Sequence, residues 1–548
     1  MRALLPTWSE WKPAFRAPGA DLLSGLIVAL VALPLALGFG ISSGLGAAAG
    51  LATAIVAGAV AAVFGGSRFQ VSGPTGAMTV VLVPIVAEHG APGVLTVGLM
   101  AGLMLVGLAF AGVGRAVRFM PAPVIEGFTA GIAVVIALQQ FPGALGIVGA
   151  EGEKVWQSAV DAVRRFVEEP HWTAPVTALA VAAVVLIGGR WLPKLPFALV
   201  AVTVSTVVAR AFDLDLGRIG AIPAGLPAPS LEFLQLDDIA TLLLPALAVA
   251  ALAALESLLS ATAADAMAVG TRHDPDRELL GQGLANIAAP LFGGVPATGA
   301  IARTAVNVRS GARTRLAALT HAAILAGIVY LAAGLVADIP IAALAGVLLA
   351  TTVRMVEAAS LAAIARASRG DAIVMMITFG VTVAFDLVTA VVIGIGFALV
   401  LAVRAIAREA TLRQVPLDET DHLGEEHALL RDNIVAYRID GPLFFAAAHR
   451  FLLELAEVAD VQVVILRMSR ITALDTTGAL VLKDAIHKLE HRHIGVLMSG
   501  LREDHRARLT TMGALPSGGD DAVFPDTGSA ISHARRMVSA RRQQQARS

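Results

Sequence analysis

The sequence has no cysteine, few charged side chains and few aromatic ones. The absence of cysteine from 548 residues excludes disulfide bonds, thiolate metal ligands and cysteine nucleophiles. Charged residues make up only 15% of the chain, against roughly 25% in soluble domains, while hydrophobic residues reach 56%. This is not the composition of a water-soluble enzyme, and the chain is not expected to be an enzyme.

An excess of one charge sign is also missing, because 41 Lys and Arg stand against 42 Asp and Glu. A nucleic-acid partner is therefore not indicated. The chain has neither an HExxH motif nor a GxxxxGK[ST] loop, so we expect no metal site, no cofactor and no ATP-driven pumping. Glycine, in contrast, is abundant at 53 residues, and small residues allow membrane helices to pack closely.

Long apolar runs follow one another between about residues 21 and 408. A membrane-spanning helix needs about 20 apolar residues. The pattern predicts fourteen segments, of which the third and the tenth are too short to cross fully. They lie at residues 22–42, 46–65, 74–88, 93–113, 122–145, 173–189, 196–212, 238–262, 279–292, 297–309, 316–336, 339–355, 371–385 and 387–406. Residues 1–20 are expected to be a cytoplasmic N-terminal segment and not a cleaved signal peptide.

The connections between these segments differ in charge on the two sides. Arg115, Arg272 and Arg313 lie in connections on the side of the N-terminus, whereas the short connections 43–45 and 89–92 contain no Lys or Arg. The longer connections 146–172 and 213–237 are exceptions, since their few basic residues are diluted by acidic ones. The positive-inside rule therefore predicts a multi-pass protein of the inner (plasma) membrane with both termini in the cytoplasm.

The two short segments begin with similar sequences. The third opens with Gly73-Pro74-Thr75-Gly76-Ala77 and the tenth with Pro296-Ala297-Thr298-Gly299-Ala300. Proline in a first helical turn, after an extended strand, is typical of a helix that begins partway through the membrane. The alternative is that Pro and Gly only mark two loops.

The predicted segments form two halves, residues 21–212 and 238–408, with seven segments each. Because seven is odd, the second half is inverted relative to the first, which gives an all-α membrane domain built as a 7+7 inverted repeat. The N-termini of the third and tenth segments then face each other near the membrane midplane. Their free N–H groups and positive dipole ends suit an anion.

Ionisable side chains within spans are candidates for function. Glu256 lies well inside the eighth segment, so we predict a proton-coupling residue, or alternatively a hydrogen-bond partner for the backbone. Arg303 follows the break of the tenth segment and could complement a substrate charge or pair with Glu256; the alternative is that it extends to the cytoplasmic surface. Phe39 ends a proline-kinked stretch of the first segment, where it could line a pocket or simply pack.

Neutral polar side chains give weaker signals. Hydroxyl donors for a ligand could come from Ser72, Thr75, Thr79, Thr298 and Thr304, although such groups more often bond their own helix. Structural or interfacial roles are expected for Glu126, Gln139, Gln140, Asp265 and Asn286.

The C-terminal region has a different periodicity. Strands are predicted at residues 434–439, 461–466 and 494–498, and helices at 449–458, 476–491 and 502–511. This alternation indicates a small α/β domain with a mainly parallel sheet, placed at residues 409–535, and the tail 536–548 is expected to be disordered. Asp475 and Thr476 stand at a strand-to-helix turn, where they can cap the helix.

Taken together, these motifs resemble the SulP family of anion transporters, which includes the motor protein prestin, and the chain is identified as a bacterial member. The membrane part carries the resemblance in Leu33-Pro34 with Gly38-Phe39, Pro74-Thr75-Gly76, Pro121 through Gly127-Phe128, and Glu256-Ser257. The C-terminal region resembles a STAS domain. Its Asp475-Thr476-Thr477-Gly478 stands where anti-sigma-factor antagonists have an Asp-Ser-Ser/Thr-Gly loop, so Asp475 and Thr476 are candidate regulatory residues.

The resemblance implies a core domain and a gate domain, a homodimer, and cytoplasmic STAS domains. It places the substrate between the third and tenth helices and makes Glu256 the coupling residue. Sodium-dependent members have Asp at that position, so Glu favours protons over sodium. The substrate-binding residues implied are Phe39, Ser72, Gly73, Pro74, Thr75, Gly299, Ala302 and Arg303.

We therefore predict a secondary active transporter of a small anion of the C4-dicarboxylate, bicarbonate or sulfate class, working by proton-coupled symport and alternating access. Its expected partners are the anion, a proton, membrane lipid and a second copy of the chain. A passive anion channel or voltage-responsive protein is one alternative. A nucleobase symporter is another, although it would be expected to carry a carboxylate on the tenth helix. A membrane receptor that signals through the STAS domain is a third.

Overall fold

A computed structural model of the 548-residue chain provides the structure. It describes residues 4–115, 121–152, 154–191, 195–235, 237–268, 272–385, 389–390, 393–401, 411–414, 433–443 and 461–545. Two compact units divide the chain, residues 1–396 and 397–548, and each is considered by itself. The domain boundary expected at residue 408 lies outside the described residues.

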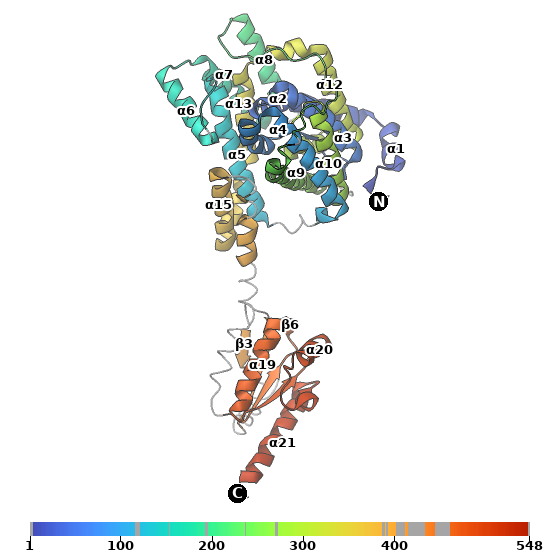
Figure 1. Ribbon diagram of the computed structural model, residues 1–548, viewed down its shortest axis with the longest axis vertical. Helices are drawn as coiled ribbons and strands as arrows, with labels where there is room; N and C mark the ends of the chain where they lie inside the picture. Colours follow the sequence, from blue (N-terminus) through green and yellow to red (C-terminus); the bar gives the residue numbers. More distant parts are fainter. Residues whose placement is uncertain are drawn as a thin grey trace. The chain divides into compact units, whose positions relative to one another are not determined.

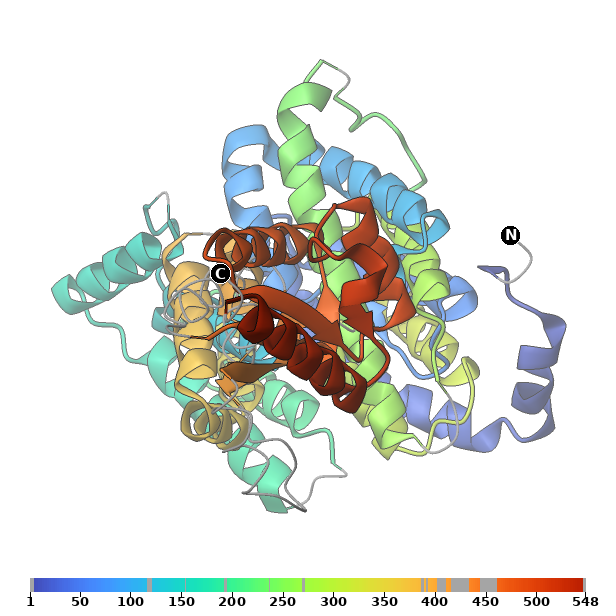
Figure 2. The ribbon, with the colours of Figure 1, turned by 90° about the horizontal axis from the view of Figure 1, so that it is seen from below.

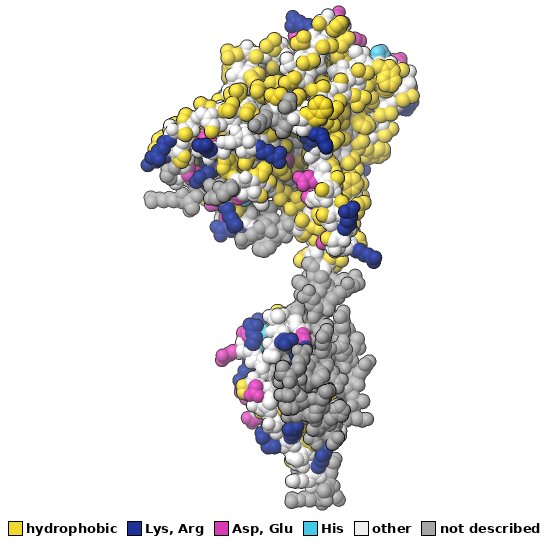
Figure 3. All heavy atoms as spheres, turned by 180° about the vertical axis from the view of Figure 1, so that it is seen from behind, with side chains coloured by type: hydrophobic (Ala, Val, Ile, Leu, Met, Phe, Trp, Pro, Cys, Tyr) yellow, Lys and Arg dark blue, Asp and Glu magenta, His cyan; other side chains and the backbone are white. Residues whose placement is uncertain are grey.

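The first unit is a bundle of apolar helices (Figure 1). Eight helices of its described part are long and apolar enough to cross a membrane. Hydrophobic side chains cover most of the face of this unit seen in Figure 3. Its helices are α1 (Trp8–Arg16), α2 (Gly19–Ser42), α3 (Ala47–Phe64), α4 (Gly76–Phe110), α5 (Ala122–Leu145), α6 (Val155–Glu168), α7 (Thr173–Trp191), α8 (Phe197–Ala211), α9 (Ile239–Met267), α10 (Pro275–Leu291), α11 (Ile301–Arg309), α12 (Leu316–Ala337), α13 (Ile341–Met355), α14 (Ala358–Ala367) and α15 (Arg369–Ala384).

These helices confirm the predicted polytopic α-helical fold. The third and fourth predicted segments are joined in α4, which is interrupted at Gly90, where φ is 66° and glycine is favoured. Of the fourteenth predicted segment, residues 389–390 and 393–401 are described, and they are helical. The amphipathic helix α6 and the short helix α14 were not predicted, because neither has an apolar run of spanning length.

The helix contacts repeat between the two halves. Helix α12 packs on α2 and α3, as α4 packs on α9 and α10, and α15 packs on α5, as α7 packs on α13. Two short strands, β1 (Ser72–Gly73) and β2 (Thr298–Gly299), precede α4 and α11 and pair antiparallel. Antiparallel pairing of corresponding elements is what an inverted repeat requires.

The strands correct one detail of the sequence prediction. Neither proline lies in a first helical turn, because α4 begins at Gly76, after Pro74, and α11 begins at Ile301, well after Pro296. The similar Thr-Gly-Ala sequences are also not equivalent in space: Thr75 is the N-cap of α4, whereas Thr298 lies in strand β2. Strand pairing, rather than the shared letters, sets the correspondence.

Small residues allow the helices around the site to approach closely. A Cβ atom added at Gly50 of α3 would lie 2.0 Å from the backbone oxygen of Ala36 in α2. One added at Gly40 of α2 would lie 2.5 Å from the backbone oxygen of Gly46. Contact between α2 and α3 at this distance is possible only without side chains.

The second unit is the predicted α/β domain. Its sheet has the order β3-β4-β5-β7-β8, with β6 also paired to β4, and every pairing except β3 with β4 is parallel. Its strands are β3 (Thr411–Gln414), β4 (Ile434–Leu443), β5 (Val463–Arg467), β6 (Ile471–Leu474), β7 (Gly495–Ser499) and β8 (Val523–Phe524). Its helices are α19 (Thr476–His491), α20 (Glu503–Thr511) and α21 (Thr527–Gln545), with α21 on one face of the sheet and α19 on the other (Figure 2).

Alternation along the strands explains this layering. In β5, Val464 and Leu466 pack with the residues of α19, while Val463 and Ile465 pack with those of α21. The predicted strands and the helices at 476–491 and 502–511 are present. The predicted helix 449–458 lies outside the described residues. Residues 536–545, expected to be disordered, belong to α21, whose apolar residues Ala534 and Val538 are buried against the sheet.

Candidate functional site

The two interrupted helices begin side by side in the first unit. Ser72 pairs with Gly299 and Gly73 with Thr298 in the β1–β2 ladder. The N–H of Ala300 also donates to the carbonyl of Val71 at 2.9 Å, which extends the ladder by one bond. The backbone thus holds the N-termini of α4 and α11 together, as predicted.

Arg303 connects these two helix starts. It lies in the first turn of α11, is 1% exposed, and its Nη2 donates to the backbone oxygen of Pro74 at 2.5 Å. Its Nη1 is buried without a hydrogen-bond partner among the described residues. A Cβ atom at Gly73 would lie 2.6 Å from this Nη1, so glycine leaves the room that the guanidinium occupies. Arg303 therefore does not extend to the cytoplasmic surface, and it keeps a free donor.

Glu256 of α9 also contacts the N-terminus of α4. Its Oε2 accepts a hydrogen bond from Thr75 Oγ1 at 2.9 Å, and its charge interacts with that of Arg303. The Thr75 hydroxyl oxygen also accepts the N–H of Met78 at 3.4 Å, which makes Thr75 the N-cap of α4. One hydroxyl group thus links the carboxylate to the start of a helix.

The remaining predicted residues divide into those near the helix starts and those engaged in holding the backbone. Phe39 is buried in α2, with its ring edge 3.1 Å from where a Cβ of Gly76 would lie. Ala302 is exposed on the first turn of α11. Ser72 accepts a hydrogen bond from Gln282 at 2.6 Å, and the N–H of Gly299 donates to Ser257 Oγ at 2.9 Å. The last two contacts stabilise the strands.

A buried polar network behind the strands was not predicted. Glu278 accepts hydrogen bonds from Gln70 Nε2 and from the N–H of Ser67, both at 2.8 Å. Asn286, for which a structural role was expected, bonds both the N–H and the carbonyl of Ala297 at 2.8 Å. A sequence signal existed, since Glu278, Gln282 and Asn286 recur every four residues and therefore share one face of α10.

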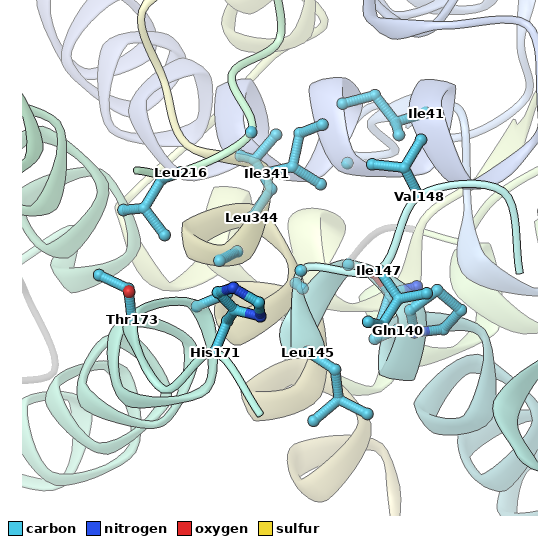
Figure 4. Close-up of a pocket in the computed structure, with 18 of the residues that line it drawn as sticks. Ile41, Gln140, Leu145, Ile147, Val148, His171, Thr173, Leu216, Ile341 and Leu344 are labelled. Atoms are coloured by element: carbon cyan, nitrogen blue, oxygen red, sulfur yellow. The ribbon is translucent and has the colours of Figure 1, made fainter. Parts of the chain in front are cut away.

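Two glutamines on α5 connect it to other helices of the unit. Gln139 Oε1 accepts a hydrogen bond from Thr79 Oγ1 of α4 at 3.3 Å, and Gln140 Nε2 donates to Ser42 Oγ of α2 at 3.1 Å. Both glutamines line a cavity of about 760 Å³ between α2, α5, α7 and α13. Aliphatic side chains surround its polar residues Gln140, His171 and Thr173 (Figure 4).

An ion-pair cluster joins α1 to the beginnings of α10 and α12. Glu10 accepts hydrogen bonds from Arg277 Nη1 at 2.7 Å and from Arg315 Nε at 3.2 Å. Burial alone would raise the pKa of Glu10, but the hydrogen bond and charge of Arg277 and the charge of Arg315 lower this pKa to about 2. Glu10 is therefore ionised at neutral pH.

The predicted loop of the second unit forms a helix cap. Asp475 Oδ1 accepts the N–H of Gly478 at 2.6 Å at the start of α19, and Thr476 is exposed beside it. Capping by Asp475 is what the sequence indicated. The regulatory role of these two residues stays a prediction.

Comparison with known proteins agrees with this architecture. Residues 19–378 match the model of the sulfate permease family, and residues 428–530 match that of the STAS domain. The chain is 35% identical over 516 residues to the putative sulfate transporter YvdB of Bacillus subtilis, covering 92% of this chain and 95% of the relative. It is 31% identical over 537 residues to the bicarbonate transporter BicA of Synechocystis, covering 95% of each chain.

Solved structures give the same result for the fold. The transmembrane domain of a cyanobacterial bicarbonate transporter BicA superposes with a TM-score of 0.64 at 35% identity, over 69% of this chain and 98% of that one. Murine Solute Carrier 26 family member A9, an anion transporter in the inward-facing state, has a TM-score of 0.84 over 98% of this chain and 94% of its own. At 16% identity, the second comparison shows the fold alone.

Proposed function

Because this chain belongs to the sulfate permease family, we propose that it is a secondary active transporter of a small oxyanion that moves together with a proton. The observation that carries the proposal is Arg303. Its guanidinium is buried where the two helices begin, Nη2 donates to the backbone oxygen of Pro74, and Nη1 has no hydrogen-bond partner among the residues that the structure describes. A buried cation with an unused donor is unfavourable unless an anion accepts from it.

The chemistry of the anion follows from the donors that surround this point. Helix α11 begins with Ile301, Ala302 and Arg303. The described residues provide no acceptor for the backbone N–H groups of these three residues. An oxyanion with several oxygens can accept from these groups and from Nη1 together. Sulfate and bicarbonate, the anions that appear in the names of the relatives, have several oxygens that can accept hydrogen bonds in this way. A C4-dicarboxylate can do so through one of its carboxylates.

Proton coupling is proposed for Glu256. When its carboxylate is ionised, it interacts with Arg303 and reduces the positive potential available to an anion. When it is protonated, that potential is restored. Anion and proton therefore favour each other's binding, which is the thermodynamic requirement for symport. Thr75, the N-cap of α4, donates a hydrogen bond to Glu256. A change in the protonation of Glu256 therefore alters a contact of the α4 N-terminus.

Alternating access is proposed as movement of α2, α4, α9 and α11, which carry the site and are taken as the core, against α5, α7, α13 and α14, which are taken as the gate. The hydrogen bonds between Thr79 and Gln139 and between Gln140 and Ser42 join these two groups of helices and would break when the cavity beside them widens. In the same proposal, both termini and the STAS domain lie in the cytoplasm, and the chain forms a homodimer in the inner membrane.

Uptake into proteoliposomes tests the proposal. Labelled sulfate, bicarbonate and a C4-dicarboxylate would be added outside the proteoliposomes, with and without an imposed pH gradient in which the external medium is acidic. We expect the gradient to accelerate uptake of the true substrate and Glu256→Gln to remove that acceleration. Glu126→Gln is the matched control, because this half-buried carboxylate of α5 accepts a hydrogen bond from Ser360 of α14 at 2.7 Å and has no contact with Arg303 or Thr75 among the described residues.

Two results would contradict the proposal. Uptake that responds to the gradient equally in Glu256→Gln would exclude the coupling role. Anion flux far above carrier turnover, measured as conductance, would instead indicate the passive channel.

A further inference from the structure

A second and larger cavity lies away from the candidate site, at the end of the bundle where α2 begins and α7, α11 and α13 end. Its volume is about 1320 Å³. We call it the basic groove, because Arg190, Arg309 and Arg354 line it together with an apolar wall formed by Leu23, Ile27 and Val31 of α2. Nothing in the transport proposal uses these residues.

The charges of the basic groove are not balanced by the protein. Its three guanidinium groups come from three different helices, and no Asp or Glu is among its described lining residues. Arg354 Nη2 donates to the backbone oxygen of Val185 at 2.5 Å, whereas neither Arg190 nor Arg309 has an ion-pair partner among the residues that the structure describes. Like charges gathered in one cavity repel each other, so the groove favours an anionic ligand.

The apolar wall indicates that this ligand is amphiphilic. Leu23, Ile27 and Val31 recur every four residues and form one stripe along α2. Eight residues of helix extend about 12 Å at 1.5 Å per residue. A small inorganic anion makes no use of such a wall, whereas an acyl chain lies along it.

The mouth of the groove is continuous with the apolar outer surface of the bundle. Leu23 is 57% exposed, Trp191 is 78% exposed and Val353 is 60% exposed, and all three line the groove. In a protein whose helices cross a membrane, exposed apolar side chains of this kind face lipid. The groove therefore opens toward the bilayer and has its arginines at the level where the helices end.

We propose that the basic groove binds an anionic phospholipid, with its phosphate at Arg190 and Arg309 and an acyl chain along Leu23, Ile27 and Val31. Basic pockets between membrane helices at the cytoplasmic side are suited to such headgroups. The groove lies between α2 and α11 on one side and α7 and α13 on the other, so the bound lipid contacts both helix groups that are proposed to move. The lipid site does not depend on the identity of the transported anion.

Quenching of Trp191 fluorescence tests this site directly. The chain has five tryptophans, so replacing Trp8, Trp11, Trp156 and Trp172 with Phe leaves Trp191 as the only one. The full-length protein would be reconstituted with brominated phosphatidylglycerol or brominated phosphatidylcholine at increasing mole fraction. We expect phosphatidylglycerol to bind at least about fivefold more tightly than phosphatidylcholine, since basic residues near the membrane surface attract an anionic headgroup.

Two variants assign that preference to the groove. The double variant Arg190→Gln/Arg309→Gln is expected to reduce the ratio of the two affinities to about one, and Arg190→Lys/Arg309→Lys to restore most of it, because charge alone attracts the headgroup. Arg366→Gln is the matched control, an exposed arginine of α14 outside the groove. Elution of each variant as a single species in gel filtration verifies folding.

Three outcomes would overturn the proposal. Equal quenching by both lipids in the unmodified protein would show that the groove has no preference for anionic lipid. A preference that persists in the double Gln variant would place the lipid elsewhere. Loss of the preference in excess inorganic phosphate would show that the arginines bind a soluble anion.

Discussion

The N-termini of α4 and α11 at the candidate site are related by the inverted repeat, yet they differ in how they are capped. Helix α4 has an N-cap, Thr75, whose side chain accepts the N–H of Met78, and its first residues are buried. Helix α11 begins after Ala300, which has no side chain for capping, and its first residues Ile301 and Ala302 are exposed. The N-terminus of α4 is therefore capped and buried by the protein. That of α11 has no side-chain cap and is exposed, and we call it the open N-terminus.

In the proposed function, this difference gives the two helix starts different tasks. The first repeat provides the Thr75 hydroxyl that contacts Glu256, and the second repeat provides Glu256 itself, the cation of Arg303 and N–H groups of α11 that have no acceptor among the described residues. We therefore call the start of α4, where Thr75 contacts Glu256, the coupling side, and the start of α11 the binding side. Variants that exchange or remove these properties test whether the asymmetry matters for transport.

The largest effect is expected at Arg303. Arg303→Gln removes the buried positive charge of the binding side, and we expect uptake to fall at least about 100-fold, which corresponds to about 2.7 kcal/mol. Arg303→Lys should restore only part of it, because a single ammonium cannot both hold Pro74 and offer a second planar donor. Initial uptake rates in proteoliposomes measure this. Arg313→Gln, an exposed arginine beyond the end of α11, is the control, and equal loss in both would contradict a specific role.

A carboxylate placed at the open N-terminus should compete with the substrate. Ala302→Asp puts a negative side chain on the exposed first turn of α11, so we expect KM to rise about tenfold, or about 1.4 kcal/mol. Thermal stability should stay equal or increase slightly, because an acidic residue suits a helix start. Ala302→Ser is the neutral control. An unchanged KM in Ala302→Asp would show that the anion binds elsewhere.

The caps themselves can be altered in opposite directions. Thr75→Val removes the cap of α4 and the bond to Glu256, and should lower the free energy of unfolding by about 1 kcal/mol and weaken the response of uptake to a pH gradient. Ala300→Ser adds a cap to α11 and should raise stability by about 0.5 kcal/mol while uptake decreases, because the new hydroxyl takes an N–H that the anion uses. Thr75→Ser retains both contacts and serves as the reference. Higher uptake in Ala300→Ser would reverse the assignment of the open end.

The smallest effect concerns the contact between the N-terminal segment and the second repeat. The pKa of Glu10 is lowered from 4.5 to about 2, so its contribution to stability is present above pH 4.5 and is lost as the pH falls toward 2. Glu10→Gln should therefore lower Tm by a few degrees at pH 7, and the difference should shrink below pH 4. Thermal unfolding in detergent measures this. Glu88→Gln, an exposed carboxylate, should leave Tm unchanged, and a pH-independent Tm difference for Glu10→Gln would contradict the ion-pair explanation.

Much of this architecture was predictable from the sequence, because the membrane permits few arrangements. Apolar runs of spanning length gave most helices, and the motifs gave the family and the STAS domain. The meeting of the helix starts that carry Thr75 and Arg303 followed from the inverted repeat, since the two breaks had to meet, whereas the hydrogen bond between Thr75 and Glu256 did not follow from it. The structure confirms that meeting in the antiparallel pairing of β1 and β2.

Other features could not be predicted because they depend on contacts between distant segments. The shared Thr-Gly-Ala letters suggested equivalent helix starts, but strand pairing shifts one relative to the other. The asymmetry of the caps was hidden for the same reason, since the sequence does not show that strand β2 ends before Ala300 and that Ala300 becomes the N-cap of α11. The ion pairs of Glu10 with Arg277 and Arg315 join residues far apart in the chain, and no local pattern indicates such a partner.

The β1–β2 ladder has a consequence for biosynthesis. Ser72 leaves the ribosome long before Gly299. Strand β1, which precedes α4, therefore stays unpaired while the segments between β1 and β2 are synthesised. The two helix starts can meet only after the tenth segment has been synthesised, so a message truncated before that segment yields a polypeptide without the β1–β2 ladder.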